Sequence, residues 1–207
     1  GEFVDGSYVV GMLAQAFLNK YPNESIVYDP RVIYNTEAVI DDLGGKAVIS
    51  KSGHSFIKQV MRESGAVYGG EMSAHHYFRD FFYCDSGMIP WLLTIELLSI
   101  TGKSLSELVN GYISAYPSSG ELNFRLTTQD AQAIIENIES RFADEKPRKS
   151  TLDGLSLDFG DWRFNLRASN TEPLIRLNIE TRGDKDLLKT KINEIEDWLA
   201  QQGAVPA

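Results

Sequence analysis

The sequence predicts an α/β fold in two parts: an α/β/α domain with a mixed, largely parallel sheet, followed by a smaller α+β domain with a four-stranded antiparallel sheet and two helices. In the first half, helical apolar periods alternate with short strand-like runs, an order that builds parallel sheets covered by helices. In the second half, apolar and polar residues alternate strictly, which indicates strands with one buried face. The turn-rich stretch 116–120 separates these patterns, so we place the domains at residues 1–115 and 116–207.

The first half is expected to begin with a helix, because Val9, Leu13 and Phe17 recur at helical spacing before Tyr21-Pro22-Asn23 interrupts the pattern. Short apolar runs bounded by turn residues predict the strands, and functional residues in such sheets gather where strands end. In chain order the predicted elements are a helix near 9–18, a strand over 25–28, a helix through 37–40, a strand over 46–50, a helix from 54 to 65, a strand over 66–68 and an apolar helix over 89–100.

The second half is expected to form the antiparallel sheet. Leu122, Phe124 and Leu126 alternate with polar neighbours, and three later segments repeat this pattern of period two. A helix follows the first strand, where Thr127 and Asp130 form a start that resembles a capping box. The predicted order is β-α-β-β-β-α, with strands near 122–126, 155–159, 162–166 and 175–179 and helices near 131–142 and 188–199.

The composition is that of a globular protein and argues against several classes of function. Lysine and arginine total 20 against 29 aspartates and glutamates, a formal charge of −9, which disfavours nucleic acid as a partner. Cys84 is the one cysteine of the sequence, and no Cys/His cluster has the spacing of a structural zinc site, so we expect no disulfide and no such metal.

The compartment is expected to be the reducing cytoplasm. The longest apolar stretch, 88–100, is shorter than the ~20 residues that a membrane span needs, so we expect no membrane as a partner. The first residues show neither the basic region nor the apolar region of a secretory signal. Because the sequence also lacks an initiator methionine, we expect it to begin inside a longer polypeptide.

The densest group of chemically useful side chains lies in 69–80, directly after a predicted strand. If this segment is extended, Glu71, Ser73 and His75 point to one side, because side chains alternate along a strand. An ionised glutamate accepts hydrogen bonds from two hydroxyls and a serine or histidine donates one back, so this row suits the neighbouring hydroxyls of a sugar. The alternative is a surface turn with incidental polar residues.

A second polar group lies in the loop between two alternating strands of the second half. Arg167 offers a planar fork that matches phosphate oxygens in pairs, and Ser169, Asn170 and Thr171 add neutral donors. These residues have the composition of a phosphate-binding loop, which we call the phosphate cradle. A hairpin loop with solvent-exposed arginines explains them equally well. Arg176 alternates with the apolar residues of its strand, so for this residue solvent exposure is the favoured interpretation.

Two further candidates are weaker. Lys51 and His54 lie where a strand ends and a helix begins, and backbone N–H groups at a helix start favour an anion. A simple helix start capped by Ser52 explains this segment almost as well. Arg31 follows Asp29-Pro30 at another strand end and, as a lone basic residue, is expected at the surface.

These motifs together resemble the α-D-phosphohexomutase superfamily, in particular its phosphomannomutase/phosphoglucomutase branch. Gly70-Glu71-Met72-Ser73-Ala74-His75 resembles the sugar-recognition loop of that family, and Arg167-Ala168-Ser169-Asn170-Thr171-Glu172-Pro173 resembles its phosphate-binding loop. The two motifs occur in the expected order and at roughly the expected separation. The resemblance covers nearly the whole chain, as the third and fourth of the family's four domains.

The resemblance implies a reversible transfer of phosphate between the 6- and 1-positions of a hexose, through a phosphoserine enzyme, a hexose 1,6-bisphosphate activator and bound Mg²⁺. By the same resemblance, Glu71 and Ser73 would hold the O3 and O4 hydroxyls of the sugar, with His75 nearby. Lys51 and His54 fall in a segment similar to the family's Lys-x-Gly-His-Ser stretch and are expected near the reacting centre. The non-reacting phosphate would be held by Arg167, Ser169, Asn170 and Thr171, and Arg31 matches a position that is often basic in relatives.

The same resemblance implies what this chain lacks. No segment resembles the family's Ser-His-Asn-Pro phosphoserine loop or its Asp-Gly-Asp-x-Asp-Arg metal loop, so we expect no catalytic nucleophile and no Mg²⁺ ligands here. Missing N-terminal domains of the same polypeptide would supply both, and the isolated chain is expected to be inactive.

The residues Met72 and Asn170 resemble those at the same positions of bacterial phosphomannomutases, which favours mannose phosphates as substrates, with glucose phosphates as further candidates. The alternatives are a non-catalytic sugar-phosphate-binding module and, third, a structural or interaction domain.

Overall fold

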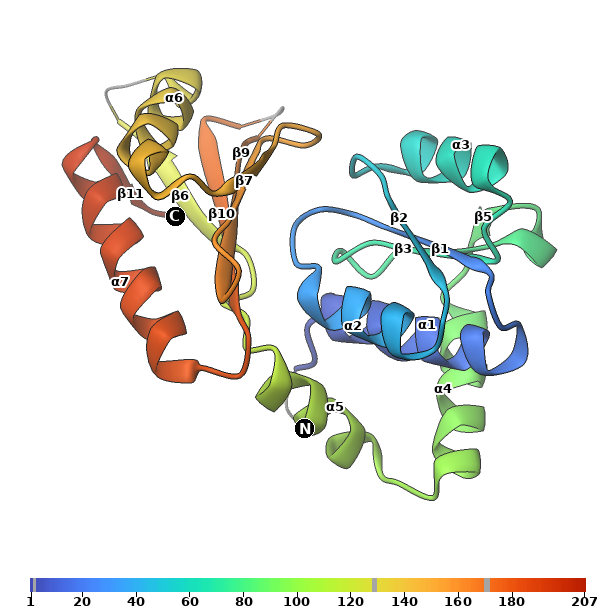
Figure 1. Cartoon of the computed structure of the whole chain (residues 1–207). Helices are drawn as coiled ribbons and strands as arrows, with labels where there is room; N and C mark the ends of the chain where they lie inside the picture. Colours follow the sequence, from blue (N-terminus) through green and yellow to red (C-terminus); the bar gives the residue numbers. More distant parts are fainter. Residues whose placement is uncertain (2, 128–129, 170–171) are drawn as a thin grey trace. The chain divides into compact units, whose positions relative to one another are not determined.

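The computed structural model describes residues 1, 3–127, 130–169 and 172–207, and the chain divides into two compact units, Gly1–Ser114 and Ala115–Ala207. We call these the N-terminal unit and the C-terminal unit; Figure 1 shows the elements of each. The division falls one residue before the predicted boundary. None of the helices in the described ranges is long and apolar enough to cross a membrane.

The N-terminal unit contains a five-stranded sheet of order β2-β1-β3-β4-β5. Strand β1 pairs in parallel with both β2 and β3, whereas β4 pairs antiparallel with both β3 and β5, so β4 runs against the other four strands of this sheet. The mixed, largely parallel sheet of the sequence prediction is therefore confirmed. The strands are β1 (Ser25–Tyr28), β2 (Lys46–Ile49), β3 (Tyr68–Gly70), β4 (His76–Phe78) and β5 (Cys84–Asp85).

Helices cover both faces of this sheet, as an α/β/α domain requires. Figure 1 shows α1 (Gly6–Lys20) and α2 (Tyr34–Asp42) on one face and α3 (His54–Ser64) on the other. Helix α3 buries Ile57 and Met61 against Val27 of the interior strand β1, and Gly65, with φ +66°, ends that helix in the left-handed conformation. The remaining helical segments of this unit are the short 3₁₀ turn Arg79–Phe81, α4 (Met88–Thr101) and α5 (Leu105–Ala115).

The C-terminal unit contains a six-stranded antiparallel sheet of order β11-β6-β10-β9-β8-β7, with α6 and α7 on one face (Figure 1). The fold class is confirmed, but the sheet has two strands more than the four predicted. The elements are β6 (Leu122–Leu126), α6 (Ala131–Arg141), the 3₁₀ turn Ala143–Glu145, β7 (Arg148–Ser150), β8 (Leu155–Asp158), β9 (Trp162–Ala168), β10 (Leu174–Thr181), α7 (Lys185–Gln201) and β11 (Ala204–Pro206).

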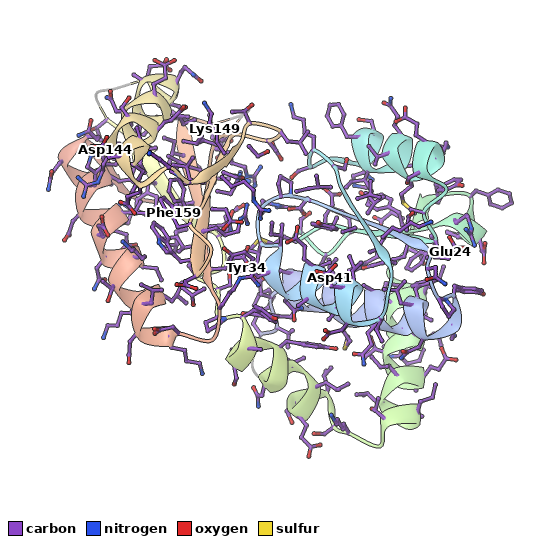
Figure 2. The ribbon with its side chains drawn as sticks, in the orientation of Figure 1. Glu24, Tyr34, Asp41, Asp144, Lys149 and Phe159 are labelled. Atoms are coloured by element: carbon purple, nitrogen blue, oxygen red, sulfur yellow. The ribbon has the colours of Figure 1, made fainter. Side chains whose placement is uncertain are left out.

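The two additional strands are three-residue edge strands that carry no alternating pattern. All three residues of β7 are exposed, and Lys149 of this strand forms an ion pair with Glu139 of α6 (Figure 2). Because neither edge strand buries a full apolar face, sequence periodicity contains no signal for them.

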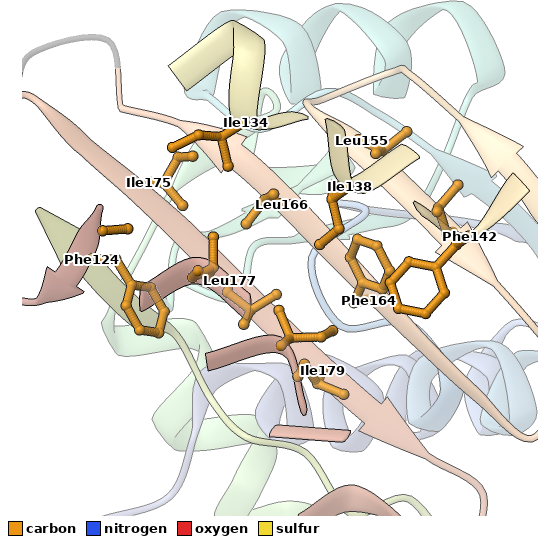
Figure 3. Packing of buried hydrophobic residues seen from close by; sticks show 14 of the residues in the cluster. Phe124, Ile134, Ile138, Phe142, Leu155, Phe164, Leu166, Ile175, Leu177 and Ile179 are labelled. Atoms are coloured by element: carbon orange, nitrogen blue, oxygen red, sulfur yellow. The ribbon is translucent and has the colours of Figure 1, made fainter. Parts of the chain in front are cut away.

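The core of the C-terminal unit lies between its sheet and its two helices. Figure 3 shows Phe124, Phe164 and Leu177 of three neighbouring strands directed toward the same interior as Ile134 and Ile138 of α6. Since side chains alternate along a strand, the intervening residues of these strands face the opposite side of the sheet. That opposite side, which we call the polar face, carries Asn123, Arg125, Ser156, Asp158, Arg163, Asn165, Arg167, Arg176, Asn178 and Glu180.

Candidate functional site

The segment 71–75 is a tight turn between β3 and β4, not an extended row. Gly70 and His76 are paired across the two antiparallel strands, so the chain must reverse within five residues. The Glu71 N–H donates to the His75 carbonyl at 2.9 Å, and Ala74 takes a positive φ of +63°. The extended conformation that the prediction assumed is therefore wrong, because strand pairing imposes a turn, and strand alternation does not set the directions of Glu71, Ser73 and His75.

Glu71 is a buried carboxylate, 3% exposed, held at the start of α3. One of its oxygens accepts a hydrogen bond from the Gly53 N–H at 2.7 Å, and the other accepts from the Tyr77 hydroxyl at 2.6 Å. Burial, together with the hydrogen bond to Glu71, raises the pKa of Tyr77, so its hydroxyl stays protonated and continues to donate. The structure thus joins the Lys51–His54 segment to the Glu71 turn, two motifs that lie apart in the sequence.

Two histidines and an aspartate meet beside this turn. His75 Nδ1 lies 2.9 Å from a carboxylate oxygen of Asp85, and the rings of His54 and His75 are edge to face with centroids 4.4 Å apart. Burial raises the pKa of Asp85, but hydrogen bonds from the His76 N–H and from His75 outweigh that effect and hold the pKa below its usual value. Asp85 thereby fixes the orientation of the His75 ring.

Within the described residues, His54, His75 and Asp85 are the one group of three side chains close enough to share a metal ion, with donor atoms within 4.8 Å of one another. Two imidazoles and one carboxylate suit zinc, whereas Mg²⁺ requires a set of oxygen ligands. The hydrogen bond between His75 and Asp85 already accounts for their closeness. These residues therefore do not fit a magnesium site.

Arg31 is buried, contrary to the expectation that it lies at the surface. Its guanidinium donates two hydrogen bonds, at 2.9 and 2.8 Å, to the two oxygens of Asp29, and this paired geometry makes its burial tolerable. Burial raises the pKa of Asp29, but the charge and hydrogen bonds of Arg31 outweigh it and hold the pKa below its usual value. The same guanidinium lies 3.3 Å from the Ser73 hydroxyl, and the Met72 N–H donates to Asp29 at 2.7 Å. Ser73, itself exposed, is thus positioned by a buried ion pair.

His76, the third histidine, is a packing residue. It is 4% exposed, and its Nδ1 lies 2.8 Å from the Tyr68 hydroxyl. Burial lowers the pKa of His76 to about 4, so the ring is neutral at physiological pH. A neutral ring that faces the interior takes no part in the polar turn next to it.

In the C-terminal unit, Arg167 and Arg176 are directly paired across β9 and β10 on the polar face. Arg167 lies 2.6 Å and Arg176 lies 3.4 Å from the two carboxylate oxygens of Glu121. The Arg176 side chain is 28% exposed, so the expectation of a solvent-exposed residue is wrong; the sheet register places it beside Arg167 and the same carboxylate. The Ser169 N–H donates to the Leu174 carbonyl at 2.8 Å, while the predicted Asn170 and Thr171 lie outside the described residues.

Comparison with protein families decides the classification. Residues 5–116 match the phosphoglucomutase/phosphomannomutase α/β/α domain III, and residues 121–197 match the C-terminal domain of the same family. The chain belongs to the phosphoglucomutase/phosphomannomutase family. The resemblance inferred from the two loop motifs is thereby confirmed.

Several curated bacterial proteins are similar to this chain. The chain is 56% identical over 195 residues to a protein named phosphomannomutase from Salmonella montevideo, covering 94% of this chain and 42% of that protein. It is 53% identical over 191 residues to a phosphomannomutase from Escherichia coli strain K12, covering 92% of this chain and 41% of that protein. The chain thus spans about two fifths of the length of these relatives.

Solved structures of the family share the fold. A phosphoglucomutase/phosphomannomutase family protein from Burkholderia thailandensis superposes with a TM-score of 0.79 at 28% identity, covering all of this chain and 44% of that one. The family fold that the motifs implied is thus the fold observed.

Four residues that shape these sites were missed by sequence reasoning: Asp29, Tyr77, Asp85 and Glu121. For two of them, Tyr77 and Glu121, the position in the sequence contained a signal that could have identified them. Tyr77 lies two residues after His75 on an alternating stretch, and Glu121 lies two residues before Asn123, which places it in line with the polar face of β6. Asp29 and Asp85 gave none, because their partners are brought to them by strand pairing and by the turn.

Proposed function

We propose that this chain is the sugar- and phosphate-binding part of a longer phosphohexomutase that interconverts mannose 6-phosphate and mannose 1-phosphate, with glucose phosphates as further substrates. The observation that carries the proposal is the buried Glu71 carboxylate at the start of α3, with Ser73 and His75 on the same turn. The names of the bacterial relatives support the choice of a mannose phosphate. The hexose 1,6-bisphosphate would be both intermediate and activator of the whole enzyme.

The N-terminal unit would recognise the sugar. Glu71 already accepts two hydrogen bonds, and a carboxylate with about four acceptor positions can accept more from the hydroxyls of a hexose. Ser73 would donate from the exposed side of the turn, where Arg31 orients it. His75, oriented by Asp85, and the neighbouring His54 and Lys51 would lie near the reacting phosphate.

The C-terminal unit would hold the phosphate that does not react. Arg167 and Arg176 present two guanidinium groups on one face of the sheet, and such groups bind phosphate oxygens in pairs. Ser169, Asn170 and Thr171 would complete the cradle with neutral donors from the loop after β9. Fixing this end of the substrate would orient the other end for transfer.

The chemical step would need groups from other domains of the polypeptide. The described residues do not fit Mg²⁺, and no residue in this chain is proposed as the phosphorylated nucleophile. We therefore expect the chain alone to bind phosphosugars without turnover, and the intact polypeptide to use Mg²⁺ and a phosphoserine supplied by its N-terminal domains.

Equilibrium titration of the chain with mannose 6-phosphate, with mannose and with inorganic phosphate tests the proposal. We expect the phosphosugar to bind more tightly than either part, because each unit contributes contacts. Equal affinity for the phosphosugar and inorganic phosphate would contradict the role of the Glu71 turn. A mutase assay of the intact polypeptide, with a hexose 1,6-bisphosphate present, separates an enzyme from a non-catalytic sugar-phosphate-binding module.

A further inference from the structure

The pairing of Arg167 with Arg176 is electrostatically unfavourable by itself. The register of β9 and β10 places the two residues directly opposite each other, where like charges repel. Their side chains are only 15% and 28% exposed, so water screens this repulsion incompletely. An anion on the polar face would relieve this repulsion.

Glu121 supplies that anion. Strand β6 pairs with β10 so that Asn123 is opposite Arg176, and Glu121, two residues earlier, is directed to the same face. Its two oxygens lie 2.6 Å from Arg167 and 3.4 Å from Arg176, so one carboxylate bridges both guanidinium groups. This is the arrangement that two oxygens of a phosphate would take between the same arginines.

The carboxylate neutralises the arginine pair only in part. Two guanidinium charges and one carboxylate leave a net charge of +1, whereas a phosphate monoester carries about −1.5 to −2 at pH 7 and could neutralise both arginines alone. The buried Nε atoms of Arg167 and Arg176 also have no hydrogen-bond partner within the described residues. The site is therefore occupied by a weaker anion than it can accept.

We propose that Glu121 is a built-in counter-anion that bridges Arg167 and Arg176 in the unliganded protein and is displaced when the substrate's phosphate binds. This inference rests on the proposed function, which assigns that phosphate to Arg167. Glu121 lowers phosphate affinity by competition, and it returns to the arginines when the phosphate leaves. A departing bisphosphate consequently does not leave two unpaired cations behind, which suits an intermediate that must reorient before the second transfer.

The test measures binding of inorganic phosphate by isothermal titration calorimetry to the whole chain and to its variants. Glu121→Gln keeps the size of the side chain and removes its charge, so we expect roughly tenfold tighter phosphate binding, the scale of one displaced, partly buried ion pair. Glu136→Gln on the exposed face of α6 is the matched control, because it makes the same change in net charge. For this control we expect a change of less than about twofold.

Two results distinguish this inference from the proposed function. If Glu121→Gln binds phosphate no more tightly than the unaltered chain, while Arg167→Ala still weakens binding, Glu121 is a positioning residue and the counter-anion idea is overturned. If phosphate binding to the unaltered chain is insensitive to Arg167→Ala, the phosphate cradle itself is wrong. If the glutamine variant fails to fold, Glu121→Asp is the second variant for the same measurement. It shortens the reach of the carboxylate and should bind phosphate between two- and tenfold more tightly.

Discussion

The two units prepare their polar groups in opposite ways. In the N-terminal unit, backbone N–H groups fix each key carboxylate: Gly53 donates to Glu71, Met72 to Asp29 and His76 to Asp85. In the C-terminal unit, two arginines on a sheet face share the side chain of Glu121. A backbone donor cannot move away without unfolding, but a side-chain counter-ion can. This difference agrees with the proposed roles, in which one unit makes directional contacts with sugar hydroxyls and the other exchanges anions.

The largest expected effect tests how strongly the fixed carboxylates support the N-terminal unit. Asp29→Ala would leave the buried Arg31 guanidinium without its two hydrogen bonds, and we expect a loss of about 3–5 kcal/mol in the free energy of unfolding. Urea titration with hydrogen exchange of the β1 amides reports this unit alone. Glu24→Gln, which removes the more exposed ion pair with Arg79, is the control and should cost less than about 1 kcal/mol.

The next effect is a pH dependence of stability that originates in His76. In the unfolded state the His76 ring has its ordinary pKa near 6.5, whereas in the folded state its pKa is about 4. Unfolded chains therefore hold more protons between these values, and stability is lost as the pH falls through this window, by up to about 3 kcal/mol. Urea unfolding of the N-terminal unit at pH 7, 6, 5 and 4.5 measures the slope. His76→Asn should flatten it, and an unchanged slope in that variant would assign the effect to other groups.

Removal of the Arg167 guanidinium should have a somewhat smaller effect, which we expect in ligand affinity and not in the free energy of unfolding. Arg167→Ala is expected to weaken affinity for mannose 6-phosphate by about 2 kcal/mol, roughly 30-fold, because it removes one charged partner of the phosphate. Arg141→Ala provides the matched control, since Arg141 is an exposed arginine on α6, on the opposite side of the sheet from Arg167. Calorimetric titration should show the loss in the first variant alone. Equal losses would indicate only a general electrostatic attraction.

The smallest effect tests whether sugar recognition and phosphate binding belong to different units. Glu71→Gln should lower affinity for mannose 6-phosphate about tenfold, because an amide cannot accept from Gly53, Tyr77 and the sugar at once. Affinity for inorganic phosphate should stay unchanged, whereas Arg167→Ala should lower both affinities. Glu63→Gln on the exposed side of α3 serves as the control. Loss of inorganic phosphate binding in Glu71→Gln would show that the two roles are not separate.

The fold was predictable where burial imposes a pattern. Strands predicted over 25–28 and 46–50 appear as Ser25–Tyr28 and Lys46–Ile49, because each is a short apolar run between turn residues. The helix expected to begin at His54 and end at Gly65 occupies His54–Ser64. Strands β4 and β5 were missed, since their residues are mostly polar or aromatic and their length of three and two residues is too short to show a period.

The candidate site was predictable in its residues but not in its geometry. A density of polar side chains pointed to Glu71, Ser73 and His75, but the extended conformation expected for this segment is wrong, because the chain makes a turn there. Arg31 and Arg176 were expected in solvent because a lone arginine on a wet face is common. Their carboxylate partners, Asp29 and Glu121, become visible only when strand register and loop closure are known.

The sequence by itself determined most of the longer helices and strands, where the two units divide and which two loops carry polar chemistry, because periodicity and turn residues act over short distances along the chain. Only the tertiary structure decided which charges meet. The hydrogen bond from the Gly53 N–H to Glu71 joins residues 18 positions apart, and the bridge from Glu121 to Arg167 and Arg176 depends on the pairing of β6 with β10, which are far apart in sequence. Pairing of this kind follows from the packing of the whole core, which no local pattern records.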